Sequence, residues 1–158
     1  MQDFIAVLDF GSQYTHLISK RIRHIGAYTR IFSPSTNENS LSRAKGIVLS
    51  GGPASVNSAK IPEFNAKLLK LNKPILGLCY GHQLIAQSFG GSISNSGKGE
   101  FGKATLEHKS DSPIWENISF PNQVWMSHQD AVTKLPKGFK IIASTKDSKL
   151  TIIENTKI

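Results

Sequence analysis

The most constraining feature of the sequence is a single cysteine set between two glycines, in the segment Gly77-Leu78-Cys79-Tyr80-Gly81. An apolar run at residues 74–78 leads into it, and residues 81–89 carry the apolar spacing of a helix. A reactive side chain on a sharp turn from a strand into a helix needs small residues two positions away on either side. The pattern therefore predicts a strand, a strained turn that carries Cys79, and a helix, which together favour an α/β fold.

The sequence before this turn shows the same alternation of strands and helices. Short, nearly continuous apolar runs predict buried strands at residues 4–10, 27–32, 46–50 and 74–78. One helix is expected between a cap at Ser12 and an end at Gly26, and another from Pro62 onward. The first helix carries five apolar residues that share one face: Tyr14, Leu17, Ile18, Ile22 and Ile25. The second carries Phe64, Leu68 and Leu71. We predict an open, twisted, largely parallel sheet flanked by helices.

The sequence changes character after Gly90-Gly91. Short candidate strands are separated by turns, and no long helical pattern occurs. These candidates lie near residues 102–107, 123–126, 140–144 and 150–154. The C-terminal third is therefore expected to add β-structure to the parallel core, within one domain that covers residues 1–158.

Composition excludes several classes of protein. A single cysteine cannot form an internal disulfide or a multi-cysteine metal site, and it agrees with a reducing compartment. The N-terminus lacks the basic start and apolar stretch of a signal peptide, and no apolar run is long enough to cross a bilayer. We therefore expect a cytoplasmic protein with no membrane partner.

The formal net charge of +8 raises the question of nucleic acid. The 19 Lys and Arg residues are scattered, however, and none of their groupings is interleaved with aromatic residues. A lysine-rich solvated surface, partly facing another domain, explains the charge better. No nucleic-acid partner is expected.

The position of Cys79 predicts a nucleophile. A helix that begins at the cysteine directs its N-terminus at the sulfur, which should lower the pKa of the thiol and favour the thiolate. The alternative is a small buried hydrophobic residue, which is the usual role of an isolated cysteine. The flanking glycines and the strand-to-helix position favour the nucleophile.

A second candidate segment, Ser50-Gly51-Gly52-Pro53, directly follows a predicted strand. In a parallel sheet it would lie at the same carboxyl edge as Cys79, where its backbone N–H groups could stabilise an oxyanion. A plain turn is an alternative, as is a phosphate-binding loop, although the segment lacks the spacing and the lysine of a P-loop.

A third candidate lies at residues 124–130 (VWMSHQD). His128 and Asp130 could form a base with its orienting carboxylate, or they could be ordinary polar groups of a loop. Among the other histidines, His82 is expected to pack beside the cysteine turn, and His16, His24 and His108 are expected at the surface.

Taken together, these residues resemble the class I glutamine amidotransferases, whose nucleophile motif is matched by Gly77-x-Cys79-x-Gly81-x-Gln83. Further stretches are similar to the GMP synthase branch of that family in order and spacing, over nearly the whole chain. They are residues 7–15 (VLDFGSQYT), 49–53 (LSGGP), 100–102 (EFG) and 124–128 (VWMSH), with Asp130. The resemblance implies the flavodoxin-like fold of that family.

The resemblance also implies roles for single residues. Cys79 would attack the side-chain amide of glutamine and form a γ-glutamyl thioester. The backbone N–H groups of Gly52 and Tyr80 would form the oxyanion hole, and Gly51 and Gln83 would help to hold the substrate. The amino-acid end of glutamine would be bound through the backbone of four residues: Ser127, His128, Gln129 and Asp130. In that role His128 is not the base.

The reaction implied by the resemblance is the hydrolysis of glutamine to glutamate. The ammonia would pass to a synthetase domain that uses ATP and Mg to aminate XMP to GMP, in purine nucleotide biosynthesis. This domain itself would need no cofactor, and the full-length protein would be a homodimer.

The sequence departs from the family pattern at three points. His82 stands where many GMP synthases have Met, and Gln129 stands where Gly is usual. The family's base and its orienting acid lie in a His-Pro-Glu motif beyond the region of residues 153–155, and no His-x-Glu occurs in this sequence. We therefore expect a chain truncated at its C-terminal end, without the synthetase domain, that has little glutaminase activity while Cys79 can still be alkylated.

Two alternatives to this interpretation stay open. One is another α/β hydrolase with a cysteine turn but different substrate-binding loops, against which the VWMSH stretch argues. The other is a module that binds glutamine or a partner domain without turnover.

Overall fold

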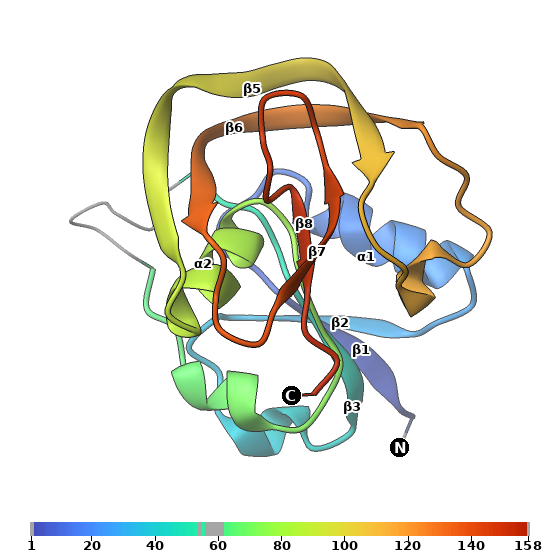
Figure 1. Cartoon of the computed structure of the whole chain (residues 1–158). Coiled ribbons are helices and arrows are strands. Elements are labelled where there is room, and N and C mark those ends of the chain that lie inside the picture. Colours follow the sequence, from blue (N-terminus) through green and yellow to red (C-terminus); the bar gives the residue numbers. More distant parts are fainter. Residues whose placement is uncertain (1, 54, 56–61, 158) are drawn as a thin grey trace. The chain divides into compact units, whose positions relative to one another are not determined.

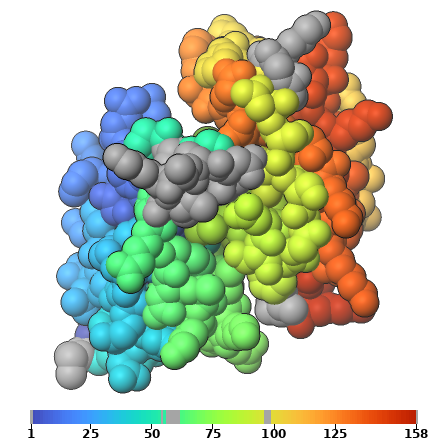
Figure 2. All heavy atoms as spheres, turned by 90° about the vertical axis from the view of Figure 1, so that its left-hand side faces the viewer, coloured from blue at the N-terminus to red at the C-terminus, as the bar shows by residue number. Residues whose placement is uncertain are grey.

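The computed structural model describes residues 2–53, 55 and 62–157, of which residues 96–98 by their backbone alone. The chain divides into two compact units, Met1–Ile85 and Ala86–Ile158. In Figure 1 the first unit runs from blue to green and the second from yellow-green to red, and Figure 2 shows the packed atoms in the same colours.

The first unit is built on a four-stranded parallel sheet, as predicted. Its strands are β1 (Phe4–Leu8), β2 (Thr29–Phe32), β3 (Ala44–Leu49) and β4 (Ile75–Gly77), in the order β2-β1-β3-β4. The register aligns the last residues of β1 and β3, Leu8 with Leu49, and pairs Leu49 with Gly77. The carboxyl ends of these strands therefore meet at one edge, where sites form in open α/β sheets. Buried aliphatic side chains of β1 and β3 supply most of the core.

Helix α1 (Thr15–His24) contacts β1 and β2, but its buried residues are polar. Thr15 donates a hydrogen bond of 2.7 Å to Asp9, and the hydroxyls of Ser19 and Thr29 lie 2.6 Å apart. The apolar residues expected to share one face of this helix do not form its buried face, since Leu17 is 47% exposed and Ile25 is 83% exposed. Hydrogen-bonded hydroxyls can be buried without penalty, so apolar spacing alone did not identify the packed face.

The helix expected from Pro62 is shorter than predicted. Only a 3₁₀-helix, η2 (Ala66–Lys70), forms, and another, η1 (Glu38–Leu41), precedes β3. The side chain of Asn65 accepts a hydrogen bond from the Lys67 backbone N–H and donates to the carbonyl oxygen of Thr36. Phe64 packs its ring 5.8 Å from that of Phe10. These contacts hold the chain before Ala66 outside a helix.

The second unit contains a four-stranded antiparallel sheet in the order β6-β5-β7-β8. Its strands are β5 (Ser92–His108), β6 (Asn122–Lys134), β7 (Lys140–Ser144) and β8 (Ile152–Glu154), with a short 3₁₀-helix η3 (Pro113–Trp115) after β5. The β-rich character was predicted, and so were the bounds of β7. The two strands expected at residues 102–107 and 123–126 are instead parts of a long curved ribbon formed by β5 and β6 (Figure 1).

Helix α2 (Tyr80–Ser88) follows β4, and the boundary between the two units falls within it. Ala86, Val132 and Leu150 form a buried apolar cluster of the second unit, against which Ile93, Leu135, Ile141 and Ile153 pack. Across the described part of the chain, no helix is both long and apolar enough to span a membrane.

Candidate active site

Cys79 lies on the turn between β4 and α2, as the sequence predicts. Its backbone has a φ of 49°, in the left-handed region that non-glycine residues rarely adopt. Hydrogen bonds brace the turn on both sides: Leu78 N–H donates to the Leu49 carbonyl at 3.0 Å, and Gln83 N–H donates to the Cys79 carbonyl at 3.0 Å. A strained backbone at the start of a helix is typical of a presented nucleophile.

The two flanking glycines are required by close backbone contacts. A Cβ atom at Gly77 would stand 2.6 Å from the carbonyl carbon and oxygen of Gly81. A Cβ atom at Gly81 would collide with the carbonyl oxygen of Leu49 and stand 2.6 Å from the Leu49 Cβ. The spacing of small residues around Cys79 therefore follows from how tightly the turn packs on β3.

The Gly51-Gly52 loop lies beside the cysteine. A Cβ atom at Gly51 would be 3.6 Å from the Cβ of Cys79, and one at Gly52 would be 2.7 Å from the Phe10 carbonyl oxygen. Ser50 anchors the loop, because its hydroxyl accepts from Phe10 N–H at 3.0 Å and donates to the Gly51 carbonyl at 2.8 Å. The structure thus brings the first two candidate segments together at one edge of the parallel sheet.

Two backbone donors near the cysteine have capacity for a ligand. Neither the N–H of Gly52 nor that of Tyr80 donates a hydrogen bond to an acceptor in the part of the chain that the structure describes. The Tyr80 N–H belongs to the first turn of α2, where backbone donors have no partner within the helix. These are the two groups that the family resemblance implies for an oxyanion hole.

Two other residues of the α2 start are buried. The Tyr80 ring is 2% exposed and lies 5.1 Å from the Phe10 ring, which fixes the first turn of α2 against the sheet. Gln83 is 7% exposed on the next turn. The side chain of Tyr80 therefore serves packing.

The expected lowering of the thiol pKa is wrong in direction. Burial raises the pKa of the Cys79 thiol above its ordinary value, because desolvation penalises the thiolate. The residue is nevertheless exposed enough to meet a reagent. A neutral thiol is a poor nucleophile, so the cysteine needs a base that removes its proton during attack.

We predict that the pH profile of alkylation reflects this raised pKa. The rate of iodoacetamide reaction at Cys79 should increase with pH and reach half its maximum at a higher pH than a short peptide of residues 77–81 measured alongside. The sign follows from the direction of the shift, since a raised pKa leaves less thiolate at any given pH below it. A plateau at lower pH than in the peptide would show that the helix N-terminus outweighs burial.

The third candidate segment, residues 127–130, lies on β6 in the second unit. Ser127 and Gln129 are exposed, while His128 and Asp130 are half-buried on the opposite face of the strand. His128 does not pair with Asp130 through its ring. Instead its Nε2 lies 3.1 Å from a carboxylate oxygen of Glu100, its cross-strand partner on β5.

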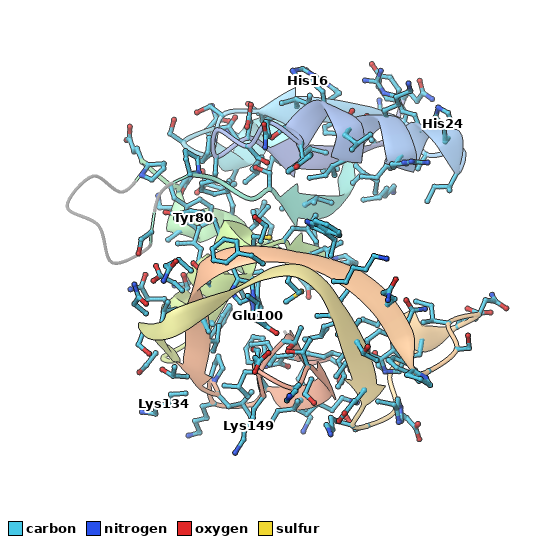
Figure 3. All side chains as sticks on the ribbon, turned by 90° about the horizontal axis from the view of Figure 1, so that it is seen from above. His16, His24, Tyr80, Glu100, Lys134 and Lys149 are labelled. Carbon is cyan, nitrogen blue, oxygen red and sulfur yellow. The ribbon has the colours of Figure 1, made fainter. Side chains whose placement is uncertain are left out.

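Glu100 is the residue that sequence reasoning missed. It is 9% exposed, and its second carboxylate oxygen accepts a 2.5 Å hydrogen bond from the Thr145 hydroxyl. The EFG stretch at residues 100–102 was one of the stretches that carry the family resemblance, but nothing in it linked Glu100 to His128. The remaining histidines lie as expected: His16, His24 and His108 are exposed, and Figure 3 shows the first two along α1.

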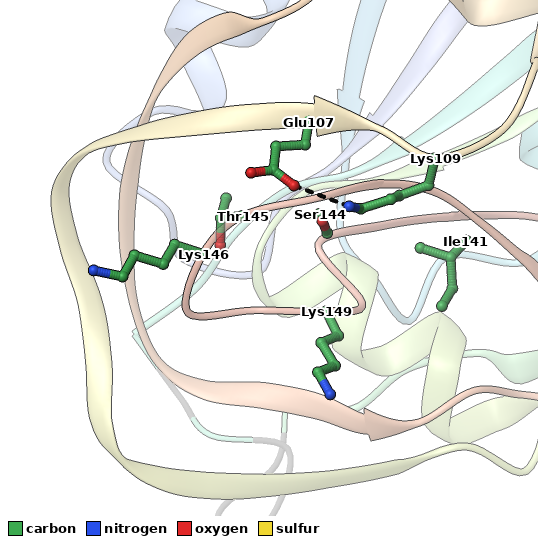
Figure 4. Close-up of a pocket in the computed structure, with 7 residues that line it drawn as sticks. All are labelled: Glu107, Lys109, Ile141, Ser144, Thr145, Lys146 and Lys149. Carbon is green, nitrogen blue, oxygen red and sulfur yellow. Dashed lines mark hydrogen bonds and ion pairs between the residues drawn. The ribbon is translucent and has the colours of Figure 1, made fainter.

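A hollow of about 570 Å³ opens in the second unit beside Thr145. Its lining includes Glu107, Lys109, Lys146 and Lys149, and Lys109 is paired with Glu107 at 2.9 Å. Figure 4 shows Lys146 and Lys149 extending away from its centre. The ammonium groups therefore do not converge on one anion.

Comparison with known proteins agrees with these features. The family Glutamine amidotransferase class-I matches residues 6–158. GMP synthase (glutamine-hydrolyzing) of Helicobacter pylori strain P12 is 48% identical over 156 residues, which are 98% of this chain and 31% of the relative. The protein of the same name from Campylobacter lari is 43% identical over 155 residues, covering 97% of this chain and 30% of the relative. The chain thus spans less than a third of the length of these curated relatives.

Solved structures show the same fold. A crystal structure from Thermoplasma acidophilum, of a protein assigned to GMP synthase, has a TM-score of 0.84 and 27% sequence identity, and covers 99% of this chain and 80% of its own. A glutamine amidotransferase of Thermotoga maritima has a TM-score of 0.74 at 18% identity, covering 98% of this chain and 73% of its own, which shows the fold alone.

Proposed function

Because the chain belongs to the class I glutamine amidotransferase family, we propose that it hydrolyses glutamine as the glutaminase part of a GMP synthase. One observation carries this proposal: Cys79 stands in a strained turn between β4 and α2, directly beside the Gly51-Gly52 loop. The named relatives support the choice of branch within the family.

In the proposed reaction the sulfur of Cys79 attacks the side-chain amide carbon of glutamine. The thiol proton goes to a base, and the amide nitrogen leaves as ammonia after taking up a proton, which gives a γ-glutamyl thioester. The N–H groups of Gly52 and Tyr80 stabilise the oxyanion. Water then releases glutamate. The base and its orienting acid belong to the family's His-Pro-Glu motif, in the longer protein.

In this proposal residues 127–130 bind the amino-acid end of glutamine, and Gly51 and Gln83 also contribute to substrate binding. The register of β5 and β6 supports a role for the backbone here. Asn95 pairs with Asp130 and Glu100 pairs with His128, so four residues of β5 stand opposite Gln129 alone. Such an irregularity locally interrupts the ladder at the segment that is proposed to meet the substrate.

The whole protein would then pass the ammonia to a synthetase domain. That domain uses ATP and Mg to aminate XMP to GMP, and the glutaminase part needs no cofactor of its own. We place the protein in the cytoplasm as a homodimer. The length of the curated relatives, of which this chain spans about 30%, leaves room for such a domain.

The test is selective trapping of Cys79. A glutamine-like electrophile should label Cys79 in the full-length protein far faster than iodoacetamide does, and free glutamine should protect against it. Equal rates with both reagents, without protection, would show a generic thiol of another cysteine hydrolase. Protection by glutamine without release of glutamate would show a binding module.

A further inference from the structure

Glu100 joins three segments of the second unit through one buried carboxylate. It comes from β5, and its two oxygens have different partners: Nε2 of His128 on β6, at 3.1 Å, and the hydroxyl of Thr145 at the end of β7, at 2.5 Å. Figure 3 shows the Glu100 side chain on the concave side of the curved β5–β6 ribbon. Both oxygens of a buried carboxylate are therefore used inside the protein.

The hydrogen bond to Glu100 fixes the orientation of the His128 ring. A carboxylate in its ionised form only accepts hydrogen bonds, so the pair then forms with the proton on Nε2 of His128. The other nitrogen, Nδ1, is buried and has no hydrogen-bond partner in the described part of the chain. Within that part, Glu100 is thus the group that holds the imidazole.

On its other side Glu100 is anchored in a hydrogen-bonded turn. The Thr145 hydroxyl accepts from Ser148 N–H at 3.0 Å, and the Thr145 N–H donates to the Ser148 carbonyl at 2.8 Å. Thr151 adds hydrogen bonds to the same turn, donating to the Ser148 carbonyl and accepting from Thr145 N–H. Thr145 and Ser148 are both buried. The carboxylate is therefore held against a network that does not depend on His128.

Gly99, in the bulge of β5 that precedes Glu100, lies against the same stretch of β6. Gly99 has a φ of 49°, and a Cβ atom there would lie 2.9 Å from the His128 carbonyl oxygen and 3.3 Å from the Gln129 Cα. Glu100 follows directly. Two contacts thus hold this stretch: Gly99 lies against the main chain of His128 and Gln129, and Glu100 holds the His128 imidazole.

We propose that Glu100 is a positioning residue for glutamine binding: with Thr145 as its anchor, it holds His128 so that the backbone of residues 127–130 is set to receive the amino-acid end of the substrate. This inference rests on the proposed function. Because the segment binds a part of glutamine that does not react, its misplacement weakens substrate and transition state alike and changes KM rather than kcat.

The experiment uses the full-length protein with Glu100→Ala, Glu100→Gln and a matched control, Glu107→Ala. Glu107 is an exposed carboxylate on the same strand, paired only with Lys109 in the described structure. We expect Glu100→Ala to raise the KM for glutamine about ten- to a hundredfold while kcat changes little. Glu100→Gln keeps an acceptor for the ring and should fall between wild type and Glu100→Ala. The control should behave as wild type.

Two further readouts separate positioning from general damage. The iodoacetamide rate at Cys79 should stay the same in all variants, and hydrogen exchange of the residue 127–130 amides should quicken in Glu100→Ala but not in Glu107→Ala. A loss of kcat with unchanged KM, or unchanged exchange at residues 127–130, would overturn the positioning role. A wild-type protein that releases no glutamate would contradict the proposed function. The hydrogen-exchange measurement would still decide whether Glu100 holds residues 127–130 in place.

Discussion

Replacing Gly81 by alanine is expected to destabilise the domain, although alanine is the better helix former. Gly81 is the second residue of α2, where helix propensity alone would favour Gly81→Ala by about 0.5–1 kcal/mol. The new methyl group would collide with the Leu49 carbonyl oxygen and meet the Leu49 Cβ at 2.6 Å. Overpacking of this kind costs about 1–3 kcal/mol, and a backbone neighbour that cannot move aside places Gly81→Ala at the upper end.

The matched control is Gly51→Ala, on the loop that faces the same turn. A Cβ atom there would meet its nearest neighbours, the Cys79 Cβ and the Ser12 hydroxyl, at 3.6 and 3.7 Å, which is ordinary contact. Its free energy of unfolding should lie within about 0.5 kcal/mol of wild type. Its glutaminase activity should fall nevertheless, since the methyl group fills space beside the nucleophile.

Urea unfolding of wild type and both variants, followed by circular dichroism, measures the difference. A Gly81→Ala midpoint at or above that of wild type would mean that the turn can move away from β3. The small residues of the cysteine motif would then reflect chemistry alone, and tight packing would not be the reason for them.

The parallel half of the fold and the nucleophile could be predicted because their signals are local. Cys79, its glycines, the strand before it and the helix after it lie within 15 residues, 74–88. The steric reason for Gly77 acts within that same turn, whereas Gly81 is required by its contact with Leu49 on β3. The loop at Ser50-Gly51-Gly52 could be placed beside Cys79 because parallel strands end at one edge.

What the sequence could not reveal depends on contacts between distant residues. The polar buried face of α1 depends on Ser19 meeting Thr29 on β2, which apolar spacing does not detect. The full length of β5 was hidden by residues 92–99, whose serines and glycines suggest turns, although β6 pairs with residues 92–95. The partner of His128 is 28 residues away, and Asp130, two residues away, was the nearer candidate.

The shift of the Cys79 pKa was predicted in the wrong direction, and the cause is again a contact between distant residues. The sequence shows that a helix begins at the cysteine, and a helix N-terminus favours the thiolate. It does not show how many atoms from other segments surround the sulfur. Desolvation by those atoms raises the pKa of the thiol. Cys79 is therefore better regarded as a neutral thiol that a base activates than as a thiolate before the substrate binds.

Substituting Cys79 by alanine should remove glutamine hydrolysis from the full-length protein. Without the sulfur no thioester forms, and the loss should be on the order of 10³-fold or more in kcat, as when a covalent nucleophile is deleted elsewhere. The fold should survive, because alanine at a φ of 49° carries the same backbone strain as cysteine and creates no new contact.

Ammonia added to the medium provides the control for Cys79→Ala. If the glutaminase part only supplies ammonia, the variant should make GMP from XMP, ATP and external ammonium at the wild-type rate while failing with glutamine. The result separates three cases. Loss of both activities would mean that the substitution damages the synthetase part as well. Survival of both would mean that another group attacks glutamine, and Cys79 would lose its assigned role. Loss of the glutamine reaction alone is the expected outcome, since only the ammonia-supplying step passes through the sulfur.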